Sequence, residues 1–353
     1  MSDNHELAKL VRLSPPRLYA VKFSWWKRPV LRQCFPHSSL RYVRCLAEVP
    51  EGETAIIWGQ RGERQEGRRH ARVWHVEDGF LRSVGLGADL IRPMSWVVDE
   101  RGAHYDATVV SDLEHCLATQ RFDARTIERA ARLRQRIVNE GLTKYNVGTG
   151  PWQRPPRAGR VILVPGQVET DASLTYGAPA IRTNLGILKA VRLANPKAHI
   201  IYKPHPDVVV GLRAKGVDED EAGRWCDEVV SDVEMARLLE AVDEVHVMTS
   251  LAGFEALLRG KPVTCYGQPF YAGWGLTTDI VPHPRRTRTL TIDELVAGSL
   301  IEYPMYFSRD GERLLSPEQA LDELLAWRSA MGGETPWWRK SFRVALRKVV
   351  GVR

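Results

Sequence analysis

Four clusters of polar side chains stand directly after short apolar runs, and their residue types could carry out nucleophilic and acid–base chemistry. The clusters occupy residues 77–79, 166–173, 203–206 and 249–255. Asp171 or Glu169 could act as a nucleophile or base, and Lys203 with His205 could neutralise a departing phosphate. Any turn between a strand and a helix also needs polar capping residues, so each cluster alone has a structural interpretation. Four clusters in register favour a functional site.

The turn at Thr249 and Ser250 is the clearest candidate for anion binding, because a predicted helix follows it. Free backbone N–H groups and the positive helix end would point at a phosphate. Gly253 has no side chain to block a nucleotide, and Glu255 could accept hydrogen bonds from ribose hydroxyls. In the structural interpretation, Ser250 only caps the helix and Glu255 only supports its dipole. Asp171 would likewise only cap a helix.

The apolar runs predict the strands that position these clusters. Runs at 161–164, 199–202, 244–248 and 262–266 are short and alternate with helical patterns. This alternation is typical of a parallel, doubly wound sheet. In such sheets ligands bind beyond the carboxyl ends of the strands, and the polar clusters stand at those ends.

The first half of the chain has a less regular pattern. Residues 55–58 and 73–76 are predicted strands, and residues 95–99 with 104–108 resemble a hairpin. A Gly- and Pro-rich break at 148–159 follows a predicted helix and is interpreted as an interdomain linker. We therefore expect an α/β protein of two domains, 1–150 and 151–305, with a helical segment at 306–353. The cleft between two such domains is the default binding site.

The composition is that of a globular protein with a basic surplus. The 353 residues are 44% hydrophobic and 26% charged, with a net charge of +7 that suits an anionic partner. Five scattered cysteines without a Cys-x-x-Cys pair predict neither a disulfide framework nor a zinc cluster. The acidic run at 218–220 is expected to be an exposed stretch rather than a metal site. We also expect no secretory signal and no membrane span, because no window approaches about 20 apolar residues.

Six segments together resemble the bacterial capsule polysaccharide synthesis family of KpsC type. They are residues 77–87, 99–108, 166–173, 202–206, 249–263 and 266–276. The likeness extends from about residue 23 to about residue 306, in the family's order. The family more often has Gly-Gln-Val-Glu-Asp-Asp where this chain has Thr170 before Asp171. This departure points to Asp171 as the functional carboxylate.

The resemblance implies a retaining β-Kdo transferase that uses CMP-Kdo as its donor substrate, with no other cofactor. It implies two Rossmann-like domains in a GT-B-like arrangement, with residues 1–150 on the acceptor side and 151–305 on the donor side. The acceptor would be a lipid-linked Kdo oligosaccharide at the inner face of the membrane, and other capsule-assembly enzymes are candidate partners. Many members hold two such modules in tandem, whereas this sequence contains one.

Kdo is an acidic ketose whose anomeric carbon bears a carboxylate, so its transfer needs a cation beside that carboxylate. Arg82 and Arg182 are the candidates, although either could be an ordinary surface arginine. Asp171 is the expected nucleophile of a double displacement, and Glu77 or Asp78 would deprotonate the acceptor hydroxyl. His205 would assist the departure of CMP without a metal ion. The residues assigned to donor binding are Gln167, Glu169, Arg82, Arg182, Lys203, Thr249, Ser250, Gly253 and Glu255.

The segment at 337–350 has a basic amphipathic pattern, with Trp338 and Phe342 on one face. Such a helix suits an anionic membrane surface, which predicts a cytoplasmic protein peripheral to the inner membrane. An equally open alternative is a helix packed back onto the N-terminal domain.

Three other functions remain open. A GT-B-like transferase with another nucleotide donor, such as a CDP-glycerol type, would share the Ser250 helix and His205. The carboxylates at 77–78 and 171 favour the Kdo interpretation over this alternative. Nucleic-acid binding would fit the pI of about 9.2, yet no nucleic-acid-binding motif is present and the basic residues are dispersed. A non-catalytic scaffold is the third.

Overall fold

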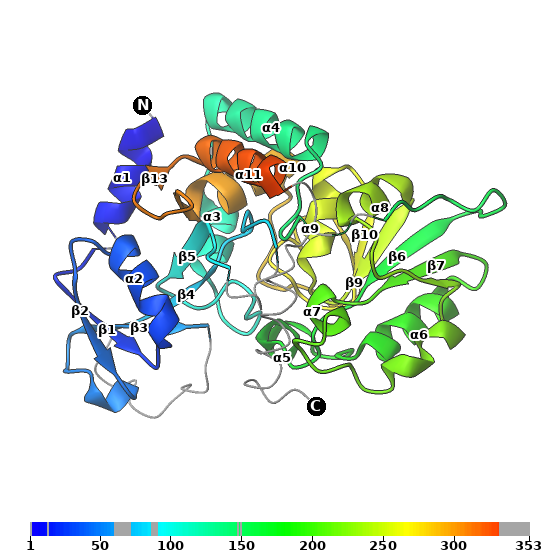
Figure 1. Cartoon of the computed structure of the whole chain (residues 1–353), viewed down its shortest axis with the longest axis horizontal. Helices are drawn as coiled ribbons and strands as arrows, with labels where there is room; N and C mark the ends of the chain where they lie inside the picture. Colours follow the sequence, from blue (N-terminus) through cyan, green and yellow to red (C-terminus); the bar gives the residue numbers. More distant parts are fainter. Residues whose placement is uncertain are drawn as a thin grey trace.

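Two β-sheets lie side by side, with a layer of helices across the region between them (Figure 1). The computed structural model describes residues 2–12, 14–59, 72–85, 91–146, 148 and 150–331. The mixed α/β architecture that the sequence predicts is therefore confirmed. The C-terminal amphipathic pattern at 337–350 lies outside the described residues.

The first sheet has seven strands in the described part of the chain, in the order β13-β12-β5-β4-β3-β1-β2. Its strands are β1 (Arg17–Val21), β2 (Ser39–Val43), β3 (Thr54–Trp58), β4 (Arg72–Asp78), β5 (Ser95–Asp99), β12 (Met305–Phe307) and β13 (Leu314–Leu315). Strands β1 to β4 are parallel, and β5, β12 and β13 pair antiparallel with their neighbours. Both strands expected at 55–58 and 73–76 are confirmed.

The hairpin expected at 95–108 is wrong in its second arm, because residues 104–108 form turns. Asp99, the last residue of β5, accepts hydrogen bonds from the backbone N–H groups of Arg101 and Gly102 at 3.0 and 2.9 Å. This side-chain turn ends the strand and redirects the chain. Strand β5 pairs with β4 and β12 instead.

The helical segment expected from residue 306 is also wrong at its start. Residues 305–307 and 314–315 return to the first sheet as β12 and β13, and only α11 (Pro317–Met331) is helical. Met305 and Phe307 bury their side chains in the first-sheet core with Trp96 and Val98. A three-residue strand carries too little periodicity to be recognised in the sequence.

The second sheet is parallel throughout its six strands in the described part of the chain, in the order β11-β10-β9-β6-β7-β8. Its strands are β6 (Val161–Pro165), β7 (His199–Lys203), β8 (Glu228–Val229), β9 (Glu244–Val247), β10 (Val263–Cys265) and β11 (Thr278–Asp279). Along β6, Val161 and Leu163 pack into one hydrophobic cluster, and Ile162 and Val164 into another. Burial on both faces explains the unbroken apolar run, so the doubly wound sheet is confirmed.

Strand order reverses at β6, because β7 lies on one side of it and β9 on the other. In an open α/β sheet this reversal opens a crevice at the carboxyl ends of the strands. The helices that follow are α5 (Ala172–Gly177) and α6 (Asn184–Ala194) after β6, α7 (Pro206–Val209) after β7, α8 (Met235–Ala241) before β9, and α9 (Leu251–Leu258) after it. The fold therefore places the clusters at 166–173 and 249–255 on either side of the crevice.

Helices from both halves of the chain form the layer between the sheets (Figure 1). They are α3 (Asp112–Thr119), α4 (Ala124–Asn139), α10 (Ile292–Val296), the π-helix η5 (Ala297–Glu302) and α11. Ion pairs join α4 to the last third of the chain, from Arg129 to Glu318 and from Arg134 to Asp293, each at 2.7 Å. Residues before and after the Gly- and Pro-rich break thus share one core.

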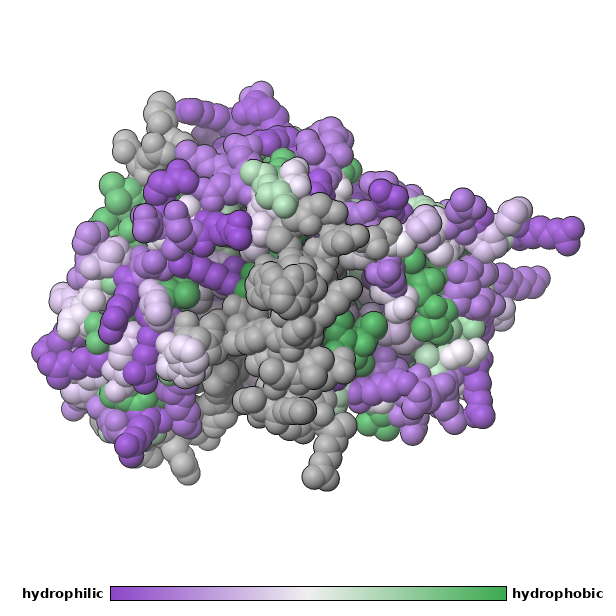
Figure 2. Space-filling view, in the orientation of Figure 1, coloured by the Kyte–Doolittle hydropathy of each residue, from purple (hydrophilic) through white to green (hydrophobic). Residues whose placement is uncertain are grey.

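The remaining helices lie mostly at the periphery. They are α1 (Ser2–Arg12), α2 (Arg28–Cys34) and the 3-10 turns η1 (Trp25–Lys27), η2 (Leu46–Glu48) and η4 (Glu219–Arg224). Hydrophilic side chains dominate the described surface over both sheets in Figure 2, and hydrophobic ones form small separate groups. Within the described ranges, no helix combines the length and apolar character that crossing a bilayer requires.

Candidate active site

A cavity of about 1120 Å³ lies between the two sheets at the strand-order reversal. The first half of the chain lines it with the turn after β4 and with the crossing segment, residues 143–146, which follows α4. The second half lines it with the turns after β6, β7 and β9. All four clusters singled out in the sequence therefore contribute to one cavity.

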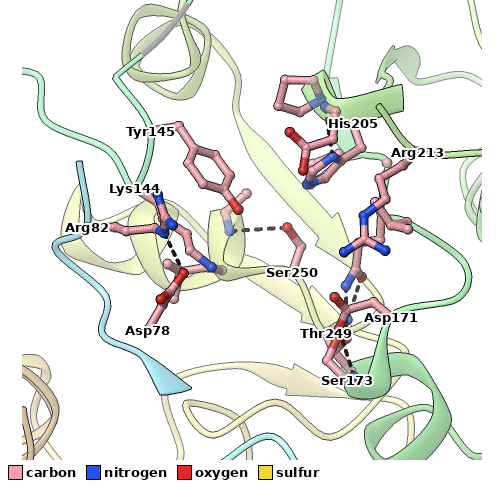
Figure 3. A pocket seen from close by; sticks show the side chains of 18 of the residues that line it. Asp78, Arg82, Lys144, Tyr145, Asp171, Ser173, His205, Arg213, Thr249 and Ser250 are labelled. Carbon is pink, nitrogen blue, oxygen red and sulfur yellow. Dashed lines mark hydrogen bonds and ion pairs between the residues drawn. The ribbon is translucent and has the colours of Figure 1, made fainter. Parts of the chain in front are cut away.

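Three helices begin at this cavity, and a side chain caps each of them. Ser250 accepts a hydrogen bond from the N–H of Ala252 in α9 at 3.3 Å, and Asp171 accepts one from Ser173 in α5 at 2.8 Å. His205 Nδ1 accepts one from Asp207 in α7 at 3.1 Å. The capping interpretation of Ser250 and Asp171 is thus correct, and both also line the cavity (Figure 3). The remaining N–H groups and the helix dipoles make this wall favourable for anions.

Gln167 ties together the two turns beside the strand-order reversal. Its Oε1 accepts a hydrogen bond from Thr249 N at 2.9 Å, and its Nε2 donates one to Thr249 Oγ1 at 3.0 Å. Thr249 Oγ1 in turn lies 3.3 Å from Ser173 Oγ. These contacts hold the starts of α5 and α9 in a fixed relation at the cavity.

Three residues expected to bind the donor do not line the cavity. Both carboxylate oxygens of Glu169 accept backbone hydrogen bonds, from Asn184 N at 2.7 Å and Val217 N at 2.9 Å, and the residue does not line the cavity. Arg182 is exposed outside the cavity and donates to Ala178 O at 2.7 Å. At Gly253, a Cβ atom would lie 2.3 Å from Tyr271 Oη, so this glycine makes room for a tyrosine rather than a nucleotide. The local sequence could not reveal the partners of Glu169 and Gly253, because Val217 and Tyr271 come from other elements.

On the opposite wall, Asp78 and the buried Arg82 form an ion pair, with Nε and Oδ2 2.5 Å apart. Arg82 also donates to Ser83 Oγ at 2.8 Å and to Ile91 O at 3.0 Å. Burial alone would raise the pKa of Asp78, but the charge of Arg82 brings it below its ordinary value. The guanidinium that we expected to bind the donor carboxylate is therefore engaged within the protein.

Glu77 stands beside this pair with a different protonation behaviour. Burial, followed by the neighbouring charge of Asp78, raises the pKa of Glu77 to about 7. Its Oε2 accepts only a long hydrogen bond of 3.3 Å from Asp78 N. The two adjacent carboxyl groups thus titrate in separate pH ranges, a pattern that distinguishes a base from a permanently charged group.

The Lys203-His205 turn is more deeply buried than the sequence indicates. Burial lowers the pKa of Lys203 to about 8, and its Nζ donates to Ser231 O at 3.2 Å. Burial and the charge of Lys144 lower the pKa of His205 to about 4, so this imidazole is neutral at pH 7. Because Nδ1 accepts a hydrogen bond, the proton resides on Nε2. His205 can therefore donate a neutral hydrogen bond to a ligand, which is one of the roles expected for it, and Lys203 is the group of this turn that can carry a positive charge.

The crossing segment was missed by sequence analysis, although it connects the two halves at the cavity. Lys144 N donates to Glu255 Oε1 at 2.7 Å, and Gly85 N donates to Tyr145 O at 2.8 Å. Asn146 has a positive φ of 50° and donates to Ser83 O at 3.1 Å. The Asn signals a turn here, but nothing in the sequence places that turn beside α9.

Glu255 lines the cavity and is only 8% exposed. Burial raises its pKa, even though Lys144 N donates to Oε1. One oxygen of its carboxylate therefore serves the protein. Other cavity residues that the sequence analysis did not select are Lys27, His104, Ser173 and Arg213.

No cluster of three or more His, Cys, Asp and Glu residues suited to a metal ion occurs within the described ranges. The acidic run at 218–220 is only partly exposed, contrary to expectation. Glu219 is buried and accepts hydrogen bonds from Gly216 N and Tyr202 Oη. The expectation of a metal-free reaction remains a prediction.

The second sheet is parallel and Rossmann-like, and capped helices begin at its strand-order reversal. Carboxylates face these helix starts across a large cavity. These features define an α/β protein suited to an anionic ligand. The family described as "Capsule polysaccharide biosynthesis protein" matches residues 55–149 and 125–307. The chain belongs to this family and is of the KpsC type, as the sequence motifs predict.

Relatives and solved structures support this assignment. The chain is 42% identical over 342 residues to the capsule polysaccharide modification protein LipA of Neisseria meningitidis, which covers 94% of this chain and 49% of LipA. The chain thus spans about half the length of LipA. It is also 42% identical over 301 residues to the lipopolysaccharide-processing protein LpsZ of Rhizobium meliloti, covering 80% of this chain and 68% of LpsZ.

Two structures of KpsC from Thermosulfurimonas dismutans are similar over nearly their whole length. The β-Kdo 2,7 transferase has a TM-score of 0.76 and 42% identity, covering 88% of this chain and 99% of that one. The β-Kdo 2,4 transferase has a TM-score of 0.79 and 30% identity, covering 89% and 99%. The arrangement of both sheets therefore follows the KpsC fold.

Proposed function

We propose that this chain is a Kdo transferase of capsule synthesis that moves β-Kdo from CMP-Kdo to a Kdo-terminated lipid acceptor with retention of configuration. The observation that carries the proposal is the match to a β-Kdo 2,7 transferase at 42% identity over 99% of that protein. The geometry supports it, because Asp171 lies in the turn between β6 and α5, in a cavity that Glu77 also lines. Residues 151–305 would hold the donor, and the first sheet would face the acceptor.

The donor phosphate would bind at the start of α9. Thr249, Ser250 and the N–H groups of that helix line the cavity, and His205 Nε2–H adds a neutral donor. Glu255 Oε2 would accept from the ribose. The leaving CMP is a stable phosphate anion, so oriented N–H groups and nearby cations suffice to stabilise the charge that develops on it.

Asp171 would act as the nucleophile of the first step. Its Oδ1 accepts from Ser173 N, which orients the carboxylate and leaves Oδ2 for attack. Oδ2 forms a bond to the anomeric carbon of Kdo while the bond from that carbon to the phosphate oxygen breaks. CMP leaves with the electron pair, and the sugar is held on Asp171 with inverted configuration.

Glu77 would act as the base of the second step. The acceptor hydroxyl gives its proton to Glu77 as its oxygen bonds to the anomeric carbon, and the bond to Asp171 breaks. The pKa of Glu77, about 7, suits proton transfer at neutral pH. Asp78 suits this role less well, because the Arg82 ion pair holds its pKa low.

Intact-protein mass spectrometry tests this mechanism directly. Protein mixed with CMP-Kdo generated in situ and no acceptor should gain the mass of one Kdo residue, and digestion should map it to Asp171. Glu169→Gln is the matched control, because Glu169 lies two residues away but outside the cavity. An adduct on another residue would refute Asp171 as nucleophile, and the absence of both adduct and transfer would refute the Kdo donor.

For the linkage, we propose β2→7 transfer. Sequence identity favours the 2,7 transferase, at 42% against 30%, whereas the TM-score is slightly higher for the 2,4 transferase, at 0.79 against 0.76. Identity carries more weight here, because specificity depends on side chains and the two TM-scores differ little. NMR of the product formed on a synthetic Kdo-terminated acceptor would decide, and a 2→4 linkage would contradict the assignment.

Membrane association is a separate proposal that rests on sequence alone. The pattern at 337–350 combines basic residues with Trp338 and Phe342, and it lies outside the described residues. Removal of residues 335–353 should lower binding to vesicles that contain anionic lipid and spare transfer to a soluble acceptor. Loss of folding on truncation would identify the segment as a structural brace instead.

A further inference from the structure

Within the described ranges, five cationic side chains line the cavity, and they differ in whether the protein already uses them. They are Lys27, Arg82, Lys144, Lys203 and Arg213. Arg82 pairs with Asp78, Lys203 donates to Ser231 O, and Lys27 lies over the ring of Trp58. The charged groups of Lys144 and Arg213 donate no hydrogen bond to any described residue. Two cations are thus available to an anionic ligand.

The backbones of these two residues are fixed, so their freedom is confined to the side chains. Arg213 N donates to Asp207 O at 3.0 Å, which anchors the loop after α7. Lys144 N is held by Glu255 Oε1, and its ammonium lies 5.3 Å from the ring centre of Tyr145. Such anchoring reduces the conformational entropy that the protein loses when a ligand binds.

The two cations occupy different parts of the cavity. Figure 3 shows the guanidinium of Arg213 directed toward the part that holds Asp171 and Thr249, while Lys144 lies on the side of Asp78. Both residues and Asp171 act electrostatically on His205, so the four side chains surround one region. Lys144 is connected through Glu255 to α9, whose start is the phosphate site proposed above.

The chemistry of the transferred sugar requires a cation near Asp171. The anomeric carbon of Kdo carries a carboxylate, so attack by Asp171 brings two anionic groups together. Like charges at short range repel each other. An arginine beside both groups would relieve that repulsion and could hold the sugar carboxylate by two parallel hydrogen bonds.

We propose that Arg213 binds the carboxylate of the transferred sugar and that Lys144 binds the donor phosphate. This inference rests on the proposed function and names the residues that select a carboxylate-bearing sugar. It replaces the two arginines expected from the sequence, because Arg82 is committed to Asp78 and Arg182 lies outside the cavity.

The test compares the KM for CMP-Kdo with the inhibition constant of CMP, which has the phosphate but no sugar carboxylate. Arg213→Ala should raise the KM for CMP-Kdo at least about tenfold, because it removes a charge-assisted contact to the sugar carboxylate. The inhibition constant of CMP should stay within about twofold of the wild-type value, because CMP has no such carboxylate. Arg213→Lys should recover part of the loss. Lys144→Gln should raise both constants. Arg182→Ala is the matched control and should change neither.

The outcomes separate this inference from the proposed function. If Arg213→Ala weakens the binding of CMP as much as the binding of CMP-Kdo, Arg213 contacts the phosphate and the inference is overturned. Unchanged constants in an Arg213→Ala protein that folds would overturn it as well. Unchanged CMP inhibition in Lys144→Gln, or in Lys144→Met if the first variant is unstable, would overturn the second assignment. A wild-type protein that transfers no Kdo would overturn the proposed function itself, and this inference with it.

Discussion

The turn after β4 and the turns after β6 and β9 face the same cavity, yet they are built differently. Strand β4 continues into a loop and then the antiparallel β5, so no helix begins at Glu77 and Asp78. Their carboxyl groups are governed by burial and by Arg82. Strands β6 and β9 continue into helices, and their polar residues cap those helices.

This difference divides the chemistry between the two halves. The mixed sheet contributes a carboxyl group with a pKa of about 7, which suits it to proton transfer. The parallel sheet contributes oriented N–H groups, which suit anion binding. Asp171 follows a strand of the parallel sheet and acts as a nucleophile in the proposed reaction. It is proposed to transfer no proton, so proton transfer remains with the first sheet.

The largest expected effect comes from Asp171→Asn. Without a carboxylate nucleophile, turnover should fall by on the order of 10³ or more. Stability should not change, because Asn is as good a helix cap as Asp and can still accept from Ser173 N. Steady-state kinetics, thermal unfolding and CMP titration check the three parts. Near-normal turnover would remove Asp171 from the chemistry.

The second prediction concerns Glu77, which must be ionised to accept a proton. The rate should rise with pH through about 7 and then level off. Glu77→Gln should lower the rate by roughly 10²-fold and abolish this rise. A variant that loses rate but keeps the same pH profile would place the base elsewhere, with Asp78→Asn as the comparison.

Glu77 should also make the stability of the fold depend on pH, in the direction opposite to its effect on the rate. Its folded-state pKa of about 7 lies above the ordinary value of 4.5, so the folded protein holds this proton more tightly than the unfolded chain. Its contribution to stability is present below about pH 4.5 and is lost as pH rises through 7. Glu77→Gln should therefore melt at a higher temperature than wild type at about pH 8, and at the same temperature near pH 4.

The sequence predicts the parallel sheet well, because strands buried on both faces leave continuous apolar runs such as 161–164. It also selects Asp171, Ser250 and Glu77, which stand at strand ends. It fails where a residue's role is decided by a distant partner. Glu169 is engaged by Val217, and Gly253 makes room for Tyr271.

The crossing segment shows a second kind of failure. Lys144 follows a helix rather than a strand, and only the packing of α4 against the helices of the second half brings it to the cavity. Strand β12 was missed for a related reason, since its pairing partner β5 lies about 200 residues earlier. Contacts between the halves leave no local pattern.

Glu255 offers the third prediction, because it serves both the fold and the ligand. Glu255→Ala removes the acceptor of Lys144 N, so unfolding should become easier by roughly 1–3 kcal/mol, and CMP should bind about tenfold more weakly. Glu255→Gln keeps an oxygen for Lys144 N and should restore most of the stability, with an intermediate CMP affinity. Calorimetry and thermal unfolding separate the two effects. Unchanged CMP affinity in both variants would place the ribose elsewhere.

The smallest expected effect comes from Ser250→Ala, and it tests the division between the halves most directly. The Ser250 cap bond is long, at 3.3 Å, and seven residues of α9 are buried by packing, so the loss should be near the lower end of about 0.5–2 kcal/mol. Ser250→Gly should lose less, because glycine is also tolerated at a cap. Since the N–H groups of α9 remain in both variants, CMP affinity should fall less than about tenfold, and the loss should shrink at high salt. Turnover at saturating donor should hardly change, because the hydroxyl is proposed to bind phosphate and not to move a proton. If Ser250→Ala instead abolished turnover while stability and CMP affinity were kept, the parallel sheet would also supply proton-transfer chemistry, and the separation of roles between the two sheets would be wrong.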